Sequence, residues 1–340
     1  MAQGYLGLKQ NQELEIVGEE YFDMLAMCSF FQDFEKDNDD NILKCKMHDI
    51  VHDFAQFLVK NECFTMGTSS DGESSCSYEN ARHLKMTLED DQASFPTIIC
   101  SIFKIRSLIV WWKYNDSSST NGAEAKNANL GSKKYLLHLE LYFDYISEAS
   151  STEVCRKDEA VLDALHPTPN LEKLFLTGYR GMSFDWMAPL TQLRKLIIRN
   201  CIKCEHLPTL GKLPLLQTLQ IRGMRSLKRV GNEFLGIKNN DSSSSSSLIF
   251  FPKLNRLILE KLQNWEDWEY EITEDFAIMP CLSFCDIAFC RKLKALPNHF
   301  LQAASLERLN IYGCPVLMQW AEIYHHLPIT RYPAGMTRVL

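Results

Sequence analysis

The stretch Leu171-Glu-Lys-Leu174-Phe-Leu176 decides the fold of this chain. Its pattern, which we call the leucine phrase, has Leu at the first and fourth positions and Leu or Ile at the sixth. Further copies begin at Leu193, Leu216, Leu254 and Leu306, and a looser copy begins at Leu282. Successive copies begin 22 to 38 residues apart. The second half of the chain is therefore predicted to be an array of similar structural units.

Each copy of the phrase has the alternation of a β-strand. Side chains in a strand point to its two faces in turn, so the fourth and sixth positions share one face and the third, fifth and seventh share the other. One unit cannot bury its own apolar stripe, and neighbouring units therefore have to stack. The sequence predicts an α/β fold, a leucine-rich-repeat solenoid shaped like a horseshoe, with the odd-numbered positions facing its concave side.

Weaker copies of the phrase extend the array toward the N-terminus. They begin at Ala81, Ile105 and Leu136, and with them we predict about nine irregular repeats over residues 81–340. Two polar tracts, Asn115–Asn129 and Asn239–Ser247, interrupt the array. Because they lack the apolar surface that would offset chain entropy, we expect both to be disordered loops.

Three repeats continue beyond the strand with the pattern Ile-x-x-Cys. They do so at Ile198–Cys201, Ile287–Cys290 and Ile311–Cys314. A free cysteine behaves as a small apolar residue, so these thiols are expected to be buried at the turn that leaves the strand.

The odd-numbered positions of the phrases supply the candidate binding surface. Many are Lys or Arg, although the chain as a whole has a net charge of −7. We predict partner-binding residues on the concave face at Lys173, Phe175, Lys195, Arg199, Arg222, Arg256, Arg308 and Tyr312. Such a basic stripe with aromatic residues suits an acidic protein partner, while the alternative is a solvated face that only screens the sheet.

Composition sets limits on the class of protein. The chain has 340 residues, of which 46% are hydrophobic and 23% charged, so it is globular. The negative net charge argues against nucleic-acid binding. The start of the chain has no secretory signal, and no apolar run reaches the ~18 residues of a membrane span. We expect a cytoplasmic protein whose 12 cysteines stay reduced.

The first part of the chain has a different pattern from the repeats. Apolar residues at helical spacing predict helices over Leu14–Cys28 and Asp49–Lys60. Between them, Phe30–Phe34 and Ile42–Met47 are predicted to be the two strands of a hairpin. We interpret residues 1–66 as a partial winged-helix domain, joined to the repeats by a linker over residues 67–80.

One segment of this domain resembles a known family. The run from Lys46 to Ala55, Lys-Met-His-Asp-Ile-Val-His-Asp-Phe-Ala, resembles the Met-His-Asp motif of plant nucleotide-binding leucine-rich-repeat disease-resistance proteins. The segments Met1–Leu6, Val17–Asp23 and Ser29–Gln32, together with the Ile-x-x-Cys repeats, also resemble that family, in its coiled-coil class.

The resemblance implies a nucleotide-dependent switch in the full-length family, closed with ADP and open with ATP. His48 would contact the β-phosphate of ADP, Met47 would pack beneath it, and Asp49 would cap the following helix. This sequence contains no P-loop of the form G-x-x-x-x-G-K-[ST]. We therefore expect the nucleotide-binding domain and the coiled coil to lie before Met1, and this chain alone to hold no nucleotide cofactor.

Two other motifs invite chemical readings. His48-Asp-Ile-Val-His52 resembles the zinc-binding H-E-x-x-H helix, with Asp in place of Glu and no third ligand evident. Cys201-Ile-Lys-Cys204 is a single C-x-x-C with no second pair. The alternatives are an ordinary surface histidine and a cysteine already explained by the repeat. We predict no enzyme activity and no metal site.

Three functions remain open at this level. The first is the recognition and autoregulatory region of an intracellular plant immune receptor, which senses a pathogen effector or a guarded host protein and also packs on its own nucleotide-binding domain. The second is a leucine-rich-repeat adaptor that recruits an enzyme. The third is a truncated receptor fragment without an independent role. The Met-His-Asp segment favours the first, because an adaptor has no need of it.

Overall fold

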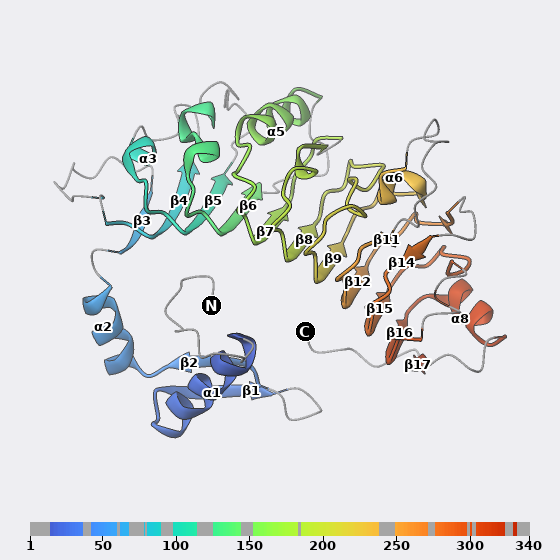
Figure 1. The fold of residues 1–340 in the computed structure, drawn as a ribbon, viewed down its shortest axis with the longest axis horizontal. Helices are drawn as coiled ribbons and strands as arrows, with labels where there is room; N and C mark the ends of the chain where they lie inside the picture. Colours follow the sequence, from blue (N-terminus) through green and yellow to red (C-terminus); the bar gives the residue numbers. More distant parts are fainter. Residues whose placement is uncertain are drawn as a thin grey trace.

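The fold is a long, curved, parallel β-sheet with a small helical module at its N-terminal end (Figure 1). It is a computed structural model that describes residues 14–36, 42–59, 62–67, 78, 80–89, 98–113, 125–143, 152–182, 185–237, 249–270, 276–297, 300, 304–323 and 329–331. The sheet has eleven strands, and every neighbouring pair is parallel. In sheet order they are β3 (Cys63–Met66), β4 (His83–Glu89), β5 (Ser107–Lys113), β6 (His138–Phe143), β7 (Lys173–Thr177), β8 (Lys195–Arg199), β9 (Thr218–Arg222), β12 (Arg256–Glu260), β15 (Phe284–Ala288), β16 (Arg308–Tyr312) and β17 (Ile329–Arg331).

The leucine phrases predict nine of these strands, from β4 to β16, so the solenoid architecture is confirmed. The outermost strands β3 and β17 extend the sheet at its two ends. The predicted domain boundary at residue 66 is wrong in this respect, because β3 pairs with β4 and belongs to the repeat sheet. Only Phe64 and Met66 of β3 turn inward, and no leading leucine marks the strand. Most of the predicted linker, residues 67–80, lies outside the described residues.

The core of the solenoid follows from the strand alternation. In β7, Leu174 and Leu176 are fully buried, while Lys173, Phe175 and Thr177 are partly exposed on the other face. The inward positions are buried along the whole array, so the inward apolar side chains of successive strands stack into one continuous cluster. In β8, β15 and β16 the middle outward residue, Ile197, Asp286 or Asn310, is buried as well. Burial of each such side chain contributes roughly 1.5–3 kcal/mol, which is why stacked repeats are stable where single ones are not.

A left-handed residue ends each central strand and turns the chain away from the sheet. These residues are Gly178, Asn200, Gly223, Lys261, Phe289 and Gly313, each with φ between 55° and 77°. The amide of each of the first five donates to the last strand carbonyl of the next repeat, at 2.7–2.9 Å; for example, Gly178 N donates to Arg199 O. The turn therefore continues the ladder between repeats for one residue beyond the strands.

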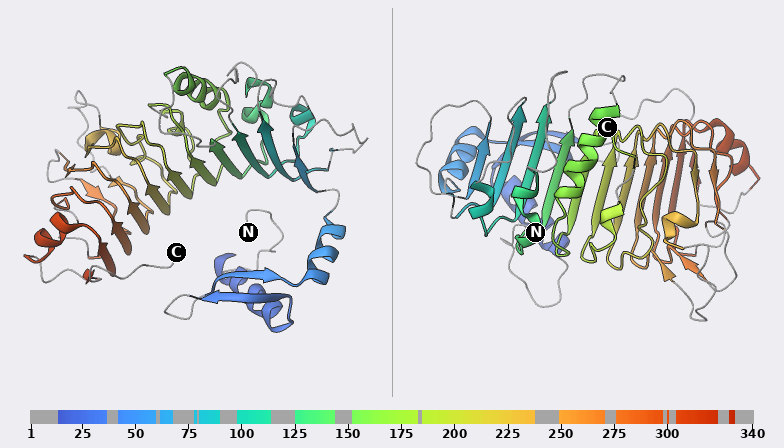
Figure 2. Two further views of the ribbon diagram at one scale, coloured as in Figure 1. Left: turned by 180° about the vertical axis from the view of Figure 1, so that it is seen from behind. Right: turned by 90° about the horizontal axis from the view of Figure 1, so that it is seen from above.

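The convex side carries short helices and turns of unequal length (Figures 1 and 2). The helical elements are α3 (Ile98–Ser101), η1 (Lys126–Ala128), η2 (Leu130–Ser132), α5 (Thr152–Ala164), η3 (Asp185–Met187), α6 (Asn232–Leu235) and α8 (Pro315–Ala321). Two short parallel pairs join β10 (Arg229–Val230) to β13 (Asp267–Trp268) and β11 (Ile249–Phe250) to β14 (Ala277–Ile278).

The polar tracts are only partly described. The end of the tract Asn115–Asn129 is ordered, contrary to prediction, because Ala125 and Ala128 are buried against the core and η1 forms there. The rest of that tract and the whole of Asn239–Ser247 lie outside the described residues.

The predicted burial of the Ile-x-x-Cys thiols is confirmed. Cys201, Cys290 and Cys314 are fully buried. Each thiol donates to the carbonyl two residues earlier, at the end of its strand, over 3.3–3.6 Å. The cysteine therefore fits a small internal site and adds a second donor to a carbonyl that already accepts a backbone amide from the preceding repeat.

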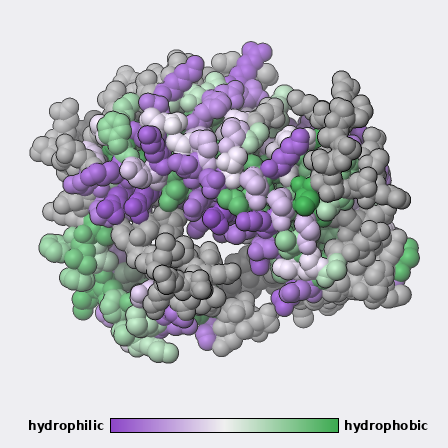
Figure 3. Space-filling view, in the orientation of Figure 1, coloured by the Kyte–Doolittle hydropathy of each residue, from purple (hydrophilic) through white to green (hydrophobic). Residues whose placement is uncertain are grey.

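The N-terminal module consists of α1 (Leu14–Met27), the antiparallel strands β1 (Phe31–Lys36) and β2 (Ile42–Met47), and α2 (Asp49–Leu58). Its order of helix, hairpin and helix is the one predicted. In Figures 1 and 2 it lies on the side toward which the sheet is concave. A hydrophobic patch covers α2 (Figure 3), where Ile50, Phe54, Phe57 and Leu58 are between 59% and 75% exposed.

Candidate functional site

The concave face is organised in rows, because the strands pair in register. Cα partners run straight across the sheet, so the outward residues of successive strands stand side by side. We call the row of first strand positions the first row; from β4 to β16 it holds His83, Ser107, His138, Lys173, Lys195, Thr218, Arg256, Phe284 and Arg308. We call the row four residues further along each strand the last row. It holds Thr87, Trp111, Tyr142, Thr177, Arg199, Arg222, Glu260, Ala288 and Tyr312.

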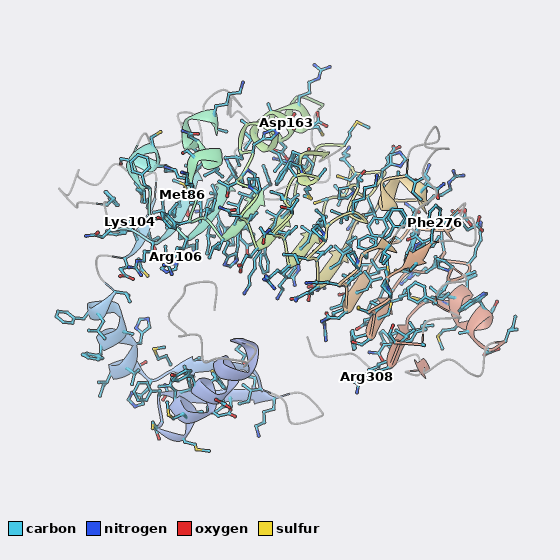
Figure 4. The ribbon with its side chains drawn as sticks, viewed as in Figure 1. Met86, Lys104, Arg106, Asp163, Phe276 and Arg308 are labelled. Carbon is cyan, nitrogen blue, oxygen red and sulfur yellow. The ribbon has the colours of Figure 1, made fainter. Side chains whose placement is uncertain are left out.

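The structure places all of the predicted partner-binding residues on this face. Lys173 and Lys195 are neighbours in the first row, which also contains Arg256 and Arg308. Arg199, Arg222 and Tyr312 stand in the last row, and Phe175 lies between the two rows. In Figure 4 the Arg308 side chain points from β16 toward the concave side. Hydrophilic side chains line the inner edge of the sheet in Figure 3.

Part of the predicted basic stripe is neutralised within the chain. Glu260, whose side chain is only 8% exposed, follows Arg222 in the last row. Arg222 Nη2 lies 3.5 Å and Lys261 Nζ 3.9 Å from Glu260 Oε1, so both are ion pairs rather than short hydrogen bonds. Arg222 is therefore less available to a partner than its position in the sequence suggests.

The centre of the face keeps its positive charge. Within the described part of the chain, no carboxylate lies within ion-pair distance of Lys173, Lys195 or Arg199. Burial lowers the pKa of Lys195, and the nearby charges of Lys173, Arg199 and Arg256 lower it further. The Lys195 Nζ also lies 5.6 Å from the centre of the Phe175 ring. Strands β7 and β8 thus form a locally electropositive surface.

Sequence reasoning missed an aromatic part of the same face. Trp111 and Tyr142 are neighbours in the last row and stack with their ring centres 4.5 Å apart. Lys85 Nζ lies 5.7 Å from the centre of the Trp111 ring. The signal was available, since Trp111 and Tyr142 hold the seventh position of the weaker phrases that begin at Ile105 and Leu136.

Glu140 holds this aromatic pair in place. The Tyr142 hydroxyl donates to Glu140 Oε2 at 2.6 Å, and His138 Nε2 lies 2.8 Å from Glu140 Oε1. The His138 imidazole is the largest cause that lowers the pKa of Glu140, and the Tyr142 hydroxyl adds to it. Burial, together with the Glu140 carboxylate, raises the pKa of Tyr142 to about 12. At neutral pH, Glu140 is therefore ionised and accepts the hydrogen bond, and Tyr142 is protonated and donates it.

The Met-His-Asp segment lies at the junction of β2 and α2. The predicted cap is wrong: His48, not Asp49, caps α2, with its Nδ1 accepting from Ile50 N at 3.4 Å. Asp49 occupies the first turn, where a carboxylate is stabilised by the helix dipole. Met47 ends β2, and its side chain is 38% exposed.

The alternative chemical readings find no support in the geometry. His48 precedes the helix instead of sharing a face with His52, whose Nδ1 lies 3.4 Å from Asp53 Oδ1. The described residues contain no group of three or more His, Cys, Asp or Glu side chains that could hold a metal. Cys204 is buried and donates to Gly181 O at 3.1 Å, as a structural thiol would.

The interior of the solenoid offers little room for a small molecule. An apolar cavity of about 10 Å³ lies among Leu207, Val230, Phe234, Leu257, Leu259, Leu262, Trp265 and Trp268. Ligand pockets usually measure roughly 300–1,000 Å³, so this void is a packing defect. The extended concave face, by contrast, is a surface of the kind that binds macromolecules.

A parallel strand in every repeat, closed by a left-handed turn and stacked on an apolar core, defines a leucine-rich-repeat protein. Residues 1–55 match the family model "Disease resistance protein Winged helix domain", and residues 114–224 match "R13L1/DRL21 LRRs". Over these two segments the chain is similar to plant disease-resistance proteins.

Similar proteins are named as disease-resistance proteins of plants. The chain is 30% identical to "Putative disease resistance RPP13-like protein 1" of Arabidopsis thaliana, over 57% of this chain and 19% of that protein. It is 34% identical to "Probable disease resistance protein RF45" of the same species, over 56% of this chain and 16% of that protein. It is also 37% identical to "Putative disease resistance protein RGA1" of Solanum bulbocastanum, over 29% of this chain and 10% of that protein.

The chain therefore spans about a fifth or less of the length of these relatives. Among the helices that the structure describes, none is both long and apolar enough to cross a membrane.

Proposed function

We propose that this chain is the recognition and autoregulatory region of a cytoplasmic plant immune receptor. Its repeats bind a protein, either a pathogen effector or a host protein that the receptor guards. The observation that supports this role is the electropositive centre of the concave face at Lys173, Lys195 and Arg199, within a surface of in-register rows. The chain acts by binding and not by catalysis, and it holds no nucleotide by itself.

The test is charge reversal on the concave face. A triple variant, Lys195→Glu, Arg199→Glu and Arg222→Glu, is compared with Arg156→Glu, Lys212→Glu and Lys253→Glu, whose exposed side chains lie outside the strands of the large sheet. Proximity labelling in plant cells is expected to lose the partners of the unmodified chain in the first variant and keep them in the second. If both variants label the same proteins as the unmodified chain, the concave face is not the recognition surface.

The N-terminal module has a separate proposed role, which applies where a nucleotide-binding domain is present in the same protein. His48, with Met47 and Asp49 beside it, contacts the phosphate of bound ADP and holds the switch closed. The position of His48 at the N-terminus of α2 supports this role, because backbone amides and the helix dipole favour an anion there. The exposed face of α2 packs on the nucleotide-binding domain in the same state.

Calorimetric titration separates the two parts of this proposal. This chain alone is expected to show no heat of ADP binding, since it has no P-loop. In a protein that adds the nucleotide-binding domain, His48→Ala is expected to weaken ADP binding about tenfold, or about 1.4 kcal/mol. Micromolar binding of ADP by this chain would contradict the first part, and unchanged affinity in the His48 variant would contradict the second.

A further inference from the structure

We infer that strands β5 to β8 form a two-part subsite for an acidic segment of a protein partner. Lys173, Lys195 and Arg199 take a carboxylate of that segment, and the stacked rings of Trp111 and Tyr142, which we call the aromatic shelf, take an aromatic or aliphatic side chain beside it. This inference rests on the proposed function of the concave face and specifies the chemistry of what that face binds.

The geometry places the two parts next to each other. In the last row, Trp111, Tyr142, Thr177 and Arg199 are successive Cα partners. Thr177 is the smallest of these side chains. It stands between Tyr142 and Arg199 in the row, so a short side chain separates the phenol from the guanidinium. Burial and Glu140 raise the pKa of Tyr142, whereas the charge of Arg199 acts on it in the opposite direction. Tyr142 and Arg199 stand two strands apart in the same row, about 10 Å at the usual strand spacing, so one ligand can touch both.

Charge selects the ligand. In the described residues, Lys173, Lys195 and Arg199 have no carboxylate partner, unlike Arg222, which is paired with Glu260. Among the residues that the structure describes, the guanidinium of Arg199 makes one long hydrogen bond, from Nη2 to Gln220 Oε1 at 3.4 Å, and its buried Nε has no acceptor. Three cations on the neighbouring strands β7 and β8, with hydrogen-bonding capacity to spare, favour a carboxylate over a neutral or cationic group.

The shelf supplies the apolar half. Trp111 is 39% exposed, and its stacking on Tyr142 fixes both rings before binding. Tryptophan and tyrosine are enriched among residues that dominate binding energy at protein interfaces. Glu140 lies beside the shelf and repels a second carboxylate there, so the acidic group has to lie over β7 and β8 and the apolar group over β5 and β6.

The strand spacing sets the distance between the two groups in the partner. Neighbouring strands lie about 4.8 Å apart, so Tyr142 of the shelf and Arg199 of the cation group, two strands apart in the same row, are separated by about 10 Å. An extended chain advances about 3.3 Å per residue. A segment that crosses the strands therefore presents its aromatic or aliphatic residue about three positions from its acidic residue.

The experiment is a selection from a displayed library of short random peptides, with the full chain as bait. The enriched sequences are expected to contain Asp or Glu about three positions from an aromatic or large aliphatic residue. Capture of these peptides is expected to fall at least about tenfold with Arg199→Glu and with Trp111→Ala. Arg308→Glu, a cation of the same face outside the subsite, and Lys212→Glu, outside the sheet, are the matched controls and are expected to retain capture. Circular dichroism confirms that each variant is folded.

Several outcomes overturn the inference. Enriched peptides without an excess of acidic residues do so, as do peptides that bind the Arg199→Glu and Trp111→Ala variants unchanged. Synthetic peptides in which phosphoserine replaces the selected Glu provide a further arm, and binding of the phosphorylated form alone would assign the site to phosphate instead of carboxylate.

The same selection distinguishes this inference from the proposed function. Peptides that depend on Arg308 or Tyr312 but not on the subsite would leave the concave face as a recognition surface and remove only the inference. Peptides that depend on none of the concave residues would remove both.

Discussion

Asp158 and Arg180 form a bidentate ion pair that joins the convex helix α5 to the turn after β7. Arg180 Nε lies 2.9 Å from Asp158 Oδ2, and Nη2 lies 3.1 Å from Oδ1. The Arg180 amide also donates to Oδ2 at 3.0 Å. Both side chains are at most 7% exposed, so this inserted helix is attached to the solenoid by a buried polar contact as well as by apolar packing.

The first prediction concerns this pair. Asp158→Ala leaves a buried guanidinium without its partner and is expected to destabilise the protein by about 3–5 kcal/mol. Replacing both members, with Asp158→Leu and Arg180→Met, is expected to recover a large part of that loss, because no buried charge then remains. Urea denaturation followed by circular dichroism measures the free energies of unfolding.

The matched control is the exposed pair Lys44–Glu35, at 3.3 Å with side chains 67% and 65% exposed. Glu35→Ala is expected to change stability by less than about 1 kcal/mol, because water screens such a pair. A cost for Asp158→Ala as small as that of the control would show that the buried pair does not hold α5.

The second prediction concerns the left-handed turn at Gly178. Its φ is +77°, and an added Cβ would collide with the carbonyl oxygen of Phe143 in the neighbouring repeat. Gly178→Ala is expected to destabilise the protein by roughly 2–4 kcal/mol, from backbone strain and displaced packing. Thermal denaturation measures this loss of stability as a lower unfolding midpoint.

Gly131 provides the control for that substitution. An added Cβ there would meet only His166 O at an ordinary 3.6 Å, and its backbone is not left-handed. Gly131→Ala is expected to change stability by no more than about 1 kcal/mol. Equal midpoints for the two variants would mean that the turn after β7 tolerates a side chain.

The third prediction concerns acid sensitivity at Glu140. Since His138 and then Tyr142 lower the pKa of Glu140 below its ordinary value of 4.5, the carboxylate stabilises the fold above that value, and this stabilisation is lost as the pH falls through the folded-state pKa. Glu140→Gln is expected to cost roughly 1–2 kcal/mol at neutral pH and to reduce the loss of stability on acidification.

Urea midpoints measured across the acid range test this prediction. Tyr142→Phe removes the hydrogen bond to Glu140 and keeps the His138 contact, so it is expected to give an intermediate acid dependence. If the Glu140→Gln variant loses stability with falling pH as steeply as the unmodified protein, another group controls the acid response.

The fourth prediction concerns the thiols. None of the cysteines in the described residues forms a disulfide, and Cys201 is fully buried, with burial raising its pKa to about 12. It therefore stays protonated and inaccessible at mildly alkaline pH, where the exposed Cys28, Cys100 and Cys281 are expected to react with iodoacetamide. Mass spectrometry of the labelled peptides gives the rates.

Full labelling of Cys201 is expected only after denaturation in urea. Labelling of Cys201 in native buffer at the rate of Cys281 would show that the repeat opens there, or that the thiol is not part of the core.

Local pattern was enough to predict most of the strands. The alternation in Leu171–Leu176 and its copies states which residues face inward, since a strand has a period of two whatever surrounds it. The same rule places Lys195, Arg199 and Phe175 on the concave face. The edge strand β3 escaped prediction because its place in the sheet depends on a neighbour, β4, and not on a leucine phrase of its own.

The sequence by itself determined the solenoid, the direction of each strand side chain and the resemblance to disease-resistance proteins. Only the tertiary structure decided which outward residues meet. Arg222 and Glu260 are separated by a long insertion yet are direct partners across the sheet, so one basic residue is neutralised while Arg199, one strand away, is not. The physical reason is that insertions of unequal length leave on the convex side, and the in-register ladder alone sets the neighbours on the concave face.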